Sequence, residues 1–151
     1  YNDEDHAYVY FKRHEHRHLK KKALENSSPM LKPFIRLGYA LRFLVFDKMG
    51  LYATNPSRVM LSMIVAIFFF AAIYILFHLL GIGHIINSVD ASDNLNVIDK
   101  SLYHSAITFF TIGYGDFYPT SFSRLISALE GWTGVFLMSY FTVAFVRKIL
   151  R

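Results

Sequence analysis

Two long apolar segments constrain the fold of this chain more than any other feature. Residues 59–82 carry no Asp, Glu, Lys or Arg, and residues 125–146 carry a single charged side chain, Glu130. Each segment exceeds the roughly 20 residues that a helix needs to cross a bilayer. The chain is 54% apolar and 18% charged, whereas soluble domains average about 45–50% and about 25%. We therefore predict an all-α membrane protein with two spanning helices, over residues 58–82 and 124–147.

The distribution of Lys and Arg predicts the orientation of these spans. Eleven of the 16 basic residues precede residue 59, and three more follow residue 146, whereas only Lys100 and Arg124 lie between the segments. The positive-inside rule places both termini in the cytoplasm and the connecting loop outside. We expect a multi-pass plasma-membrane protein whose external loop, acidic at Asp90, Asp93, Asp99 and Asp116, attracts cations.

The loop between the spans divides into two parts. Residues 83–100 are polar and predict an irregular external turret. Residues 101–111 are apolar and aromatic but too short to cross, which predicts a re-entrant pore helix with Ser101 as a possible N-cap. The negative end of its dipole would then favour a cation near residues 111–116.

Residues 111–116 read Thr-Ile-Gly-Tyr-Gly-Asp and occur once in the chain. Gly113 and Gly115 permit positive φ on either side of Tyr114, so the backbone can alternate between conformations. Successive carbonyl oxygens can then point to one side, as a dehydrated monovalent cation requires. A glycine-rich surface turn is the alternative interpretation of this string.

Residues 108–116, Thr-Phe-Phe-Thr-Ile-Gly-Tyr-Gly-Asp, resemble the signature of two-helix potassium channels of the prokaryotic type. The resemblance implies a homotetrameric pore in a bacterial or archaeal inner membrane, with K⁺ as the permeant ion. It implies a filter in which carbonyls line the ion path, the Thr111 hydroxyl forms the lowest ring and Thr108 supports the loop from the pore helix. The filter residues are Thr111, Ile112, Gly113, Tyr114 and Gly115.

The resemblance also implies how the filter is supported. Asp116 would lie at the outer mouth and bond back behind the filter, while the Tyr114 side chain would pack on Tyr103 and Phe109. Some relatives place a glutamate before the pore-helix threonine to partner this aspartate, but the residue here is Ile107. Support of that kind, and any slow inactivation that depends on it, is therefore not expected.

Three residues of the second span and one before the filter have candidate roles. Glu130 is an intramembrane carboxylate, which either braces the pore helix or filter by a hydrogen bond or reaches toward water from the outer leaflet. Gly134 is a candidate gating hinge, with close helix packing as the alternative, and for Gly131 we favour packing. Phe110 is bulkier than its counterpart in many relatives, and we expect it to pack on the second span.

The N-terminal third predicts two further helices. Residues 1–30 contain a charged cytoplasmic helix over residues 3–25, and residues 31–57 contain an amphipathic interfacial helix over residues 34–50 and a linker, with Ser57 as N-cap of the first span. Residues 148–151 are expected to form a cytoplasmic tail, and Arg147 and Lys148 would meet anionic headgroups. The chain begins at Tyr1, and we expect a soluble N-terminal regulatory region upstream of it.

The first helix is rich in histidine. His14 and His18 share a helix face at a spacing that can bind a metal ion, and with His6 and His16 they could titrate near neutral pH. A solvated helix face is the simpler interpretation.

The favoured function is passive, potassium-selective conduction through a homotetramer that opens at the inner end of the second span. The alternatives are a weakly selective cation channel, an ion-uptake transporter subunit and a channel-like, membrane-anchored interaction module that docks a partner through residues 1–25. The sequence contains no nucleophile–base set, metal-ligand cluster or phosphate loop, so we predict no enzyme activity, cofactor or nucleic-acid partner.

Overall fold

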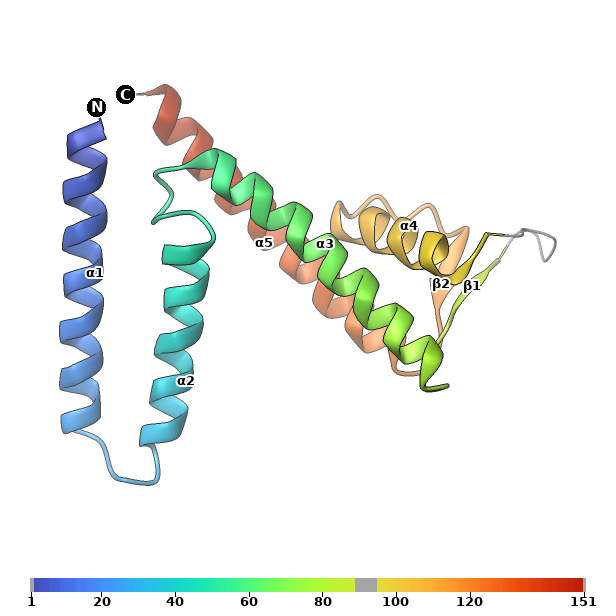
Figure 1. Cartoon of the computed structure of the whole chain (residues 1–151), viewed down its shortest axis with the longest axis horizontal. Coiled ribbons are helices and arrows are strands. Elements are labelled where there is room, and N and C mark those ends of the chain that lie inside the picture. The colour runs from blue at the N-terminus through green and yellow to red at the C-terminus, as the bar shows by residue number, and fades with distance from the viewer. Residues whose placement is uncertain (1, 89–94, 151) are drawn as a thin grey trace. The chain divides into compact units, whose positions relative to one another are not determined.

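A computed structural model describes residues 2–88 and 95–150 of the chain, and these are mostly helical (Figure 1). The elements in chain order are α1 (Asn2–Glu25), α2 (Lys32–Phe43), a short π-helical turn η1 (Leu44–Lys48), α3 (Pro56–Leu79), β1 (Ile85–Asn87), α4 (Val97–Phe109), β2 (Phe117–Pro119) and α5 (Ser123–Ile149). Residues 89–94 of the expected turret, which include Asp90 and Asp93, lie outside the described residues.

The two apolar segments are helices, as predicted. α3 and α5 are 24 and 27 residues long, and among the described residues they are the two helices long and apolar enough to cross a membrane. The chain is divided into two compact units, and both helices contribute to each of them. One unit contains the described residues up to Met60 and those from Tyr140 onward, and the other contains Leu61–Ser139.

In the first unit, α1 and α2 form an antiparallel helical hairpin (Figure 1). The His16 ring of α1 packs edge-on against Tyr39 of α2, with ring centroids 5.3 Å apart, and lies 5.8 Å from the Phe43 ring. Beyond α2, Asp47 in η1 is 1% exposed and accepts two hydrogen bonds from the Arg13 guanidinium, at 2.7 and 3.2 Å. α1 is therefore held on α2 by aromatic contacts and on η1 by an ion pair, so one side of α1 is covered.

The turn between η1 and α3 is anchored to α5. Leu51, Tyr52 and Ala53 all have positive φ, a region that costs energy for residues other than glycine. The Tyr140 hydroxyl of α5 accepts the Ala53 N–H at 2.8 Å. Ala53 and Tyr140 also belong to the small apolar core of this unit, with Val59 and Ala144. This tertiary contact holds the strained turn in place.

The N-cap of α3 is Asn55, so the predicted cap at Ser57 is wrong. The Asn55 Oδ1 atom accepts the Arg58 N–H at 3.3 Å, and Pro56 is the first helical residue. Proline suits that position because it has no N–H to satisfy and its φ is already helical. The sequence Asn55-Pro56 therefore sets the start of the helix two residues earlier than expected.

In the second unit, the predicted pore helix corresponds to α4, but its bounds differ from the predicted 101–111. Asn96 is the N-cap, with its side chain accepting the Asp99 N–H at 2.9 Å, so the helix begins four residues early. Ser101, the predicted cap, is instead inside the helix and buried. At its other end α4 stops at Phe109, because Thr111 has a positive φ that a helix cannot accommodate.

A two-stranded antiparallel sheet changes two expectations. The described chain is mostly helical but not all-α, and residues 85–87 of the expected irregular turret form a strand. β1 and β2 pair with Ile85 opposite Pro119, Ile86 opposite Tyr118 and Asn87 opposite Phe117. The sheet joins the loop that precedes α4 to the loop that follows residues 111–116 (Figure 1). Each strand has three residues, too few for a recognisable alternation, and the pairing spans more than 30 residues. Local sequence patterns therefore could not reveal it.

Candidate functional site

The loop after α4 has an alternating backbone. Thr111, Gly113 and Gly115 have φ of 56°, 56° and 79°, whereas Ile112 and Tyr114 between them are not in the positive-φ region. The two glycines adopt this conformation without strain, and Thr111 does so at an energetic cost. This is the alternation that the glycine spacing predicts.

The amide groups of this loop are anchored on α4, and its carbonyl groups are not. The Ile107 carbonyl oxygen accepts the N–H groups of Ile112 and Gly113, at 2.8 and 3.3 Å, and the Thr108 carbonyl oxygen accepts the Thr111 N–H at 3.0 Å. Among the described residues, no donor hydrogen-bonds to the carbonyl oxygens of residues 111–114. A series of exposed carbonyl oxygens without donors can replace the hydration shell of a cation.

The end of the loop at Gly115 and Asp116 is held by two residues, Tyr103 and Ser88. Asp116 accepts a hydrogen bond from the Tyr103 hydroxyl of α4 at 2.7 Å, and this bond to a carboxylate raises the pKa of Tyr103. Ser88, which follows β1, donates its hydroxyl to the Gly115 carbonyl at 2.6 Å and its N–H to the Asp116 carbonyl at 2.7 Å. Asp116 therefore has a partner behind the loop even though residue 107 is isoleucine. Neither Tyr103 nor Ser88 could be assigned this contact from the sequence.

Glu130 lies where three helices meet. Its side chain is fully buried, and its Oε2 atom accepts a hydrogen bond from the Tyr74 hydroxyl of α3 at 2.6 Å. Its Oε1 atom accepts a hydrogen bond from the Ser105 hydroxyl of α4, which also lies 2.8 Å from the Ile67 carbonyl oxygen of α3. The carboxylate therefore connects α5 to α3 and α4 and has no exposed surface from which to reach water.

Gly134 faces the end of α4 at very close range. A Cβ atom at this position would lie 2.8 Å from the Phe109 carbonyl carbon and would overlap the attached oxygen. At Gly131 the nearest atom to such a Cβ is the Thr108 carbonyl oxygen, at 3.9 Å, an ordinary contact. The contact with α5 is therefore made by the Phe109 backbone. Phe110, which we expected to pack there, has a side chain that is 43% exposed and lies against the Phe109 ring.

The side chains of the loop are uncovered in the single chain. Ile112 and Tyr114 are 51% and 72% exposed, so most of the Tyr114 side chain has no cover from its own chain. Tyr103 contacts the Phe117 ring, with centroids 5.5 Å apart.

Histidine does not form a cluster of ligands in the described part of the chain. His14 and His18 are exposed on α1, and among the described residues no group of three or more His, Cys, Asp or Glu side chains could hold a metal ion.

Comparison with known proteins identifies the class of this chain. A family model described as "Ion channel" matches residues 59–151, which is well over half of the chain. Neither the curated proteins nor the solved structures include a significant match. The matched region contains α3 from Val59 onward, the loop over residues 111–116, and α5. The chain belongs to this ion-channel family.

Proposed function

We propose that this chain is one subunit of a potassium-selective channel that conducts K⁺ passively. The observation that carries the proposal is the loop over residues 111–115: the N–H groups of residues 111–113 are bonded back to α4, while among the described residues the carbonyl groups of residues 111–114 have no donor. A selectivity filter needs carbonyl oxygens that accept no hydrogen bond from the protein, because those oxygens must coordinate the ion. The Thr111 hydroxyl would add the lowest oxygen ring.

A single copy of this loop cannot surround an ion, so the proposal includes a homotetramer with the loop on its axis. The exposed side chains of Ile112 and Tyr114 are consistent with burial against neighbouring subunits. α4 has 13 residues, or about 20 Å of helix, which is too short to cross about 30 Å of hydrocarbon. In the channel it would enter the membrane from outside and return through the filter, with both termini of the chain in the cytoplasm.

The described contacts also favour roles for residues around the filter. Glu130 would brace the pore helix through Ser105, and Tyr103 would brace Asp116. The close approach of Phe109 favours packing as the reason for glycine at position 134. A bend at Gly134 during opening is compatible with that contact only if α4 and α5 separate locally.

The selectivity proposal is tested by the reversal potential of the purified protein in planar bilayers under opposing K⁺ and Na⁺ gradients. We expect reversal close to the K⁺ equilibrium potential. Gly113→Ala should abolish discrimination between K⁺ and Na⁺, because alanine is disfavoured at φ 56° although no atom of the described residues lies within 4 Å of its Cβ. Gly38→Ala, in α2, is a matched control because its Cβ also meets no atom and its φ is not positive.

Each alternative function predicts a different result. Reversal near zero with normal currents would replace potassium selectivity with weak cation selectivity. A correctly folded and assembled protein that passes no current in any cation gradient would favour the membrane-anchored interaction module.

A further inference from the structure

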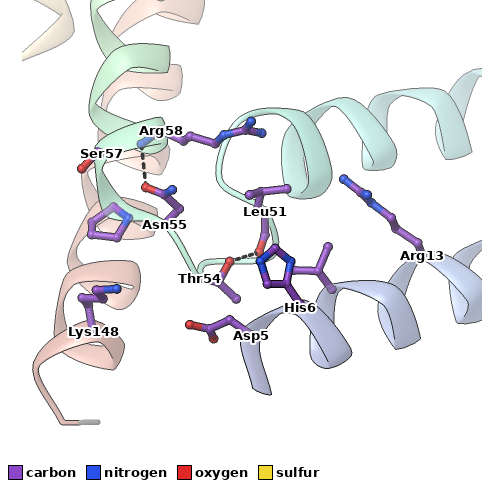
Figure 2. A pocket seen from close by; sticks show the side chains of 11 residues that line it. Asp5, His6, Arg13, Leu51, Thr54, Asn55, Ser57, Arg58 and Lys148 are labelled. Carbon is purple, nitrogen blue, oxygen red and sulfur yellow. Dashed lines mark hydrogen bonds between the residues drawn. The ribbon is translucent and has the colours of Figure 1, made fainter. Parts of the chain in front are cut away.

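A pocket of about 530 Å³ lies in the first unit, where the start of α3 and the end of α5 meet the N-terminal part of α1 (Figure 2). Its volume is within the range of roughly 300–1,000 Å³ that small-molecule sites occupy. Because α3 and α5 are the two candidate spans, their terminal turns lie at the level of the lipid headgroups. The pocket is separate from the filter loop and from Glu130, so the proposed conduction mechanism leaves it unexplained.

Positive charge predominates in the lining of this pocket. Arg13, Arg58 and Lys148 come from three different helices and face one lining carboxylate, Asp5, which gives a formal charge of +2 with His6 neutral. In Figure 2 these side chains surround a common space. Basic pockets at the ends of transmembrane helices bind the phosphate groups of anionic lipids.

The hydrogen-bond donors of the lining also suit a phosphate group. Arg13 uses Nε and Nη2 for its ion pair with Asp47, so its Nη1 donors are outside that pair. Ser57 and Arg58 are in the first turn of α3, where the helix dipole adds to the attraction for an anion. The Ser57 hydroxyl and the Asn55 side-chain amide add neutral donors, since the Asn55 Oδ1 atom is already used by the helix cap.

Exposed apolar side chains that lie close in sequence to the basic lining residues favour a lipid over a free phosphate ion. Met60 of α3, Ile149 of α5 and the adjacent Leu150 are 53%, 64% and 80% exposed. They lie within a few residues of Arg58 and Lys148 in the sequence and can contact acyl chains when the headgroup occupies the pocket. Inorganic phosphate would gain nothing from this surface. We propose that the pocket binds the phosphate headgroup of an anionic glycerophospholipid.

The proposal is tested by native mass spectrometry of the purified protein, titrated with phosphatidylglycerol or with phosphatidylcholine of the same acyl chains. We expect the intact protein to bind phosphatidylglycerol more tightly. Arg58→Gln/Lys148→Gln should weaken phosphatidylglycerol binding roughly 30-fold, because each basic group near the surface contributes about 5-fold. Arg17→Gln/Lys22→Gln, which removes two exposed charges from α1 outside the lining, should change it by no more than about twofold.

Two further variants keep the test decisive if the double substitution impairs folding. Arg58→Lys/Lys148→Arg keeps both charges and should bind nearly as tightly as the unaltered protein. Lys148→Gln alone changes one exposed side chain in the last turn of α5, and it should lower the affinity about fivefold.

The outcomes that would overturn the proposal are distinct. Equal affinity for the two lipids, or equal losses in the lining variant and the α1 control, would show that the pocket does not select an anionic headgroup. Displacement of the bound lipid by millimolar inorganic phosphate would identify a soluble phosphate site instead. None of these measurements requires conduction, so their failure would leave the proposed potassium selectivity standing.

Discussion

At the scale of single residues, Glu130 is a fully buried carboxylate that accepts hydrogen bonds from two other helices. It is the acceptor for two buried hydroxyl groups, those of Tyr74 and Ser105. Glu130→Ala removes that acceptor, and unsatisfied buried polar groups cost about 1–3 kcal/mol each. The Ser105 hydroxyl can still donate to the Ile67 carbonyl oxygen, so the Tyr74 hydroxyl is the group left without an acceptor. We therefore expect Glu130→Ala to lower the free energy of unfolding by about 1–3 kcal/mol, measured by thermal or denaturant unfolding of the purified protein.

Glu130→Gln distinguishes the effect of Glu130 on protein stability from its proposed role in bracing the pore helix. Glu130→Gln retains one acceptor atom and should lose much less stability than Glu130→Ala. Because its amide places a donor where the carboxylate accepts, we still expect a shorter open lifetime in single-channel recordings. Unchanged selectivity and open lifetime in Glu130→Gln would remove the bracing role. Tyr74→Phe, which deletes one of the two donors, gives the matched double-mutant cycle.

Gly134 and Gly131 form a natural pair for testing close packing. An added methyl group at Gly134 would collide with the Phe109 backbone, whereas one at Gly131 would be in ordinary contact. We expect Gly134→Ala to destabilise the protein by about 1–3 kcal/mol, as overpacking does. Gly131→Ala should be neutral or stabilise by up to about 1 kcal/mol, because alanine is the better helix former. Thermal unfolding compares the two, and equal stability would contradict the packing explanation for Gly134.

At the scale of elements, we expect the pairing of α1 with α2 to depend on pH through His16. Burial lowers the pKa of His16, the neighbouring Arg42 and Lys20 lower it further, and Asp47 opposes them. The folded pKa is thus below the unfolded value of about 6.5, and the unfolded state binds more protons in between. The contribution of His16 is therefore complete above about pH 6.5 and is lost as the pH falls toward the folded pKa. Melting temperatures measured from about pH 8 to about pH 5 should show this loss.

Two substitutions identify the histidine responsible. His16→Phe keeps a ring against Tyr39 without a titratable group, so its stability should depend less on pH. His14→Phe changes an exposed ring on the same helix and should retain the pH dependence of the unaltered protein. If both variants titrate alike, the sensitivity lies elsewhere.

The sequence predicts those elements whose signal is local. The two candidate spanning helices follow from long apolar runs, and the positive φ at positions 113 and 115 follows from the two glycines. The start of α4 also has a local signal, which the expected start at Ser101 does not use: Asn96 is the N-cap, and its side chain accepts the Asp99 N–H. The β1–β2 sheet, the Tyr74–Glu130 bond and the Arg13–Asp47 pair join residues 30 or more positions apart. Such contacts depend on which helix faces pack together, and this packing cannot be inferred from one sequence alone.

At the scale of the whole molecule, the proposed assembly and its ion sites make a joint prediction. If carbonyl rings on the tetramer axis bind K⁺, the ion stabilises the folded assembly by RT ln(1 + [K⁺]/Kd), about 2.7 kcal/mol at 100 times Kd. We expect a native mass equal to four 17.5 kDa chains and a higher melting temperature in K⁺ than in Na⁺ at equal ionic strength.

The filter variants separate the assembly from its ion sites. Gly113→Ala should keep the tetrameric mass but lose the difference between K⁺ and Na⁺, because the altered backbone φ disturbs the carbonyl ring while no side chain is displaced. Gly38→Ala should retain both properties. A tetramer whose melting temperature is the same in K⁺ and Na⁺ would contradict the ion sites and leave the assembly intact. A monomer in mild detergent at every protein concentration would contradict the assembly itself, since one loop alone provides only one side of each ion site.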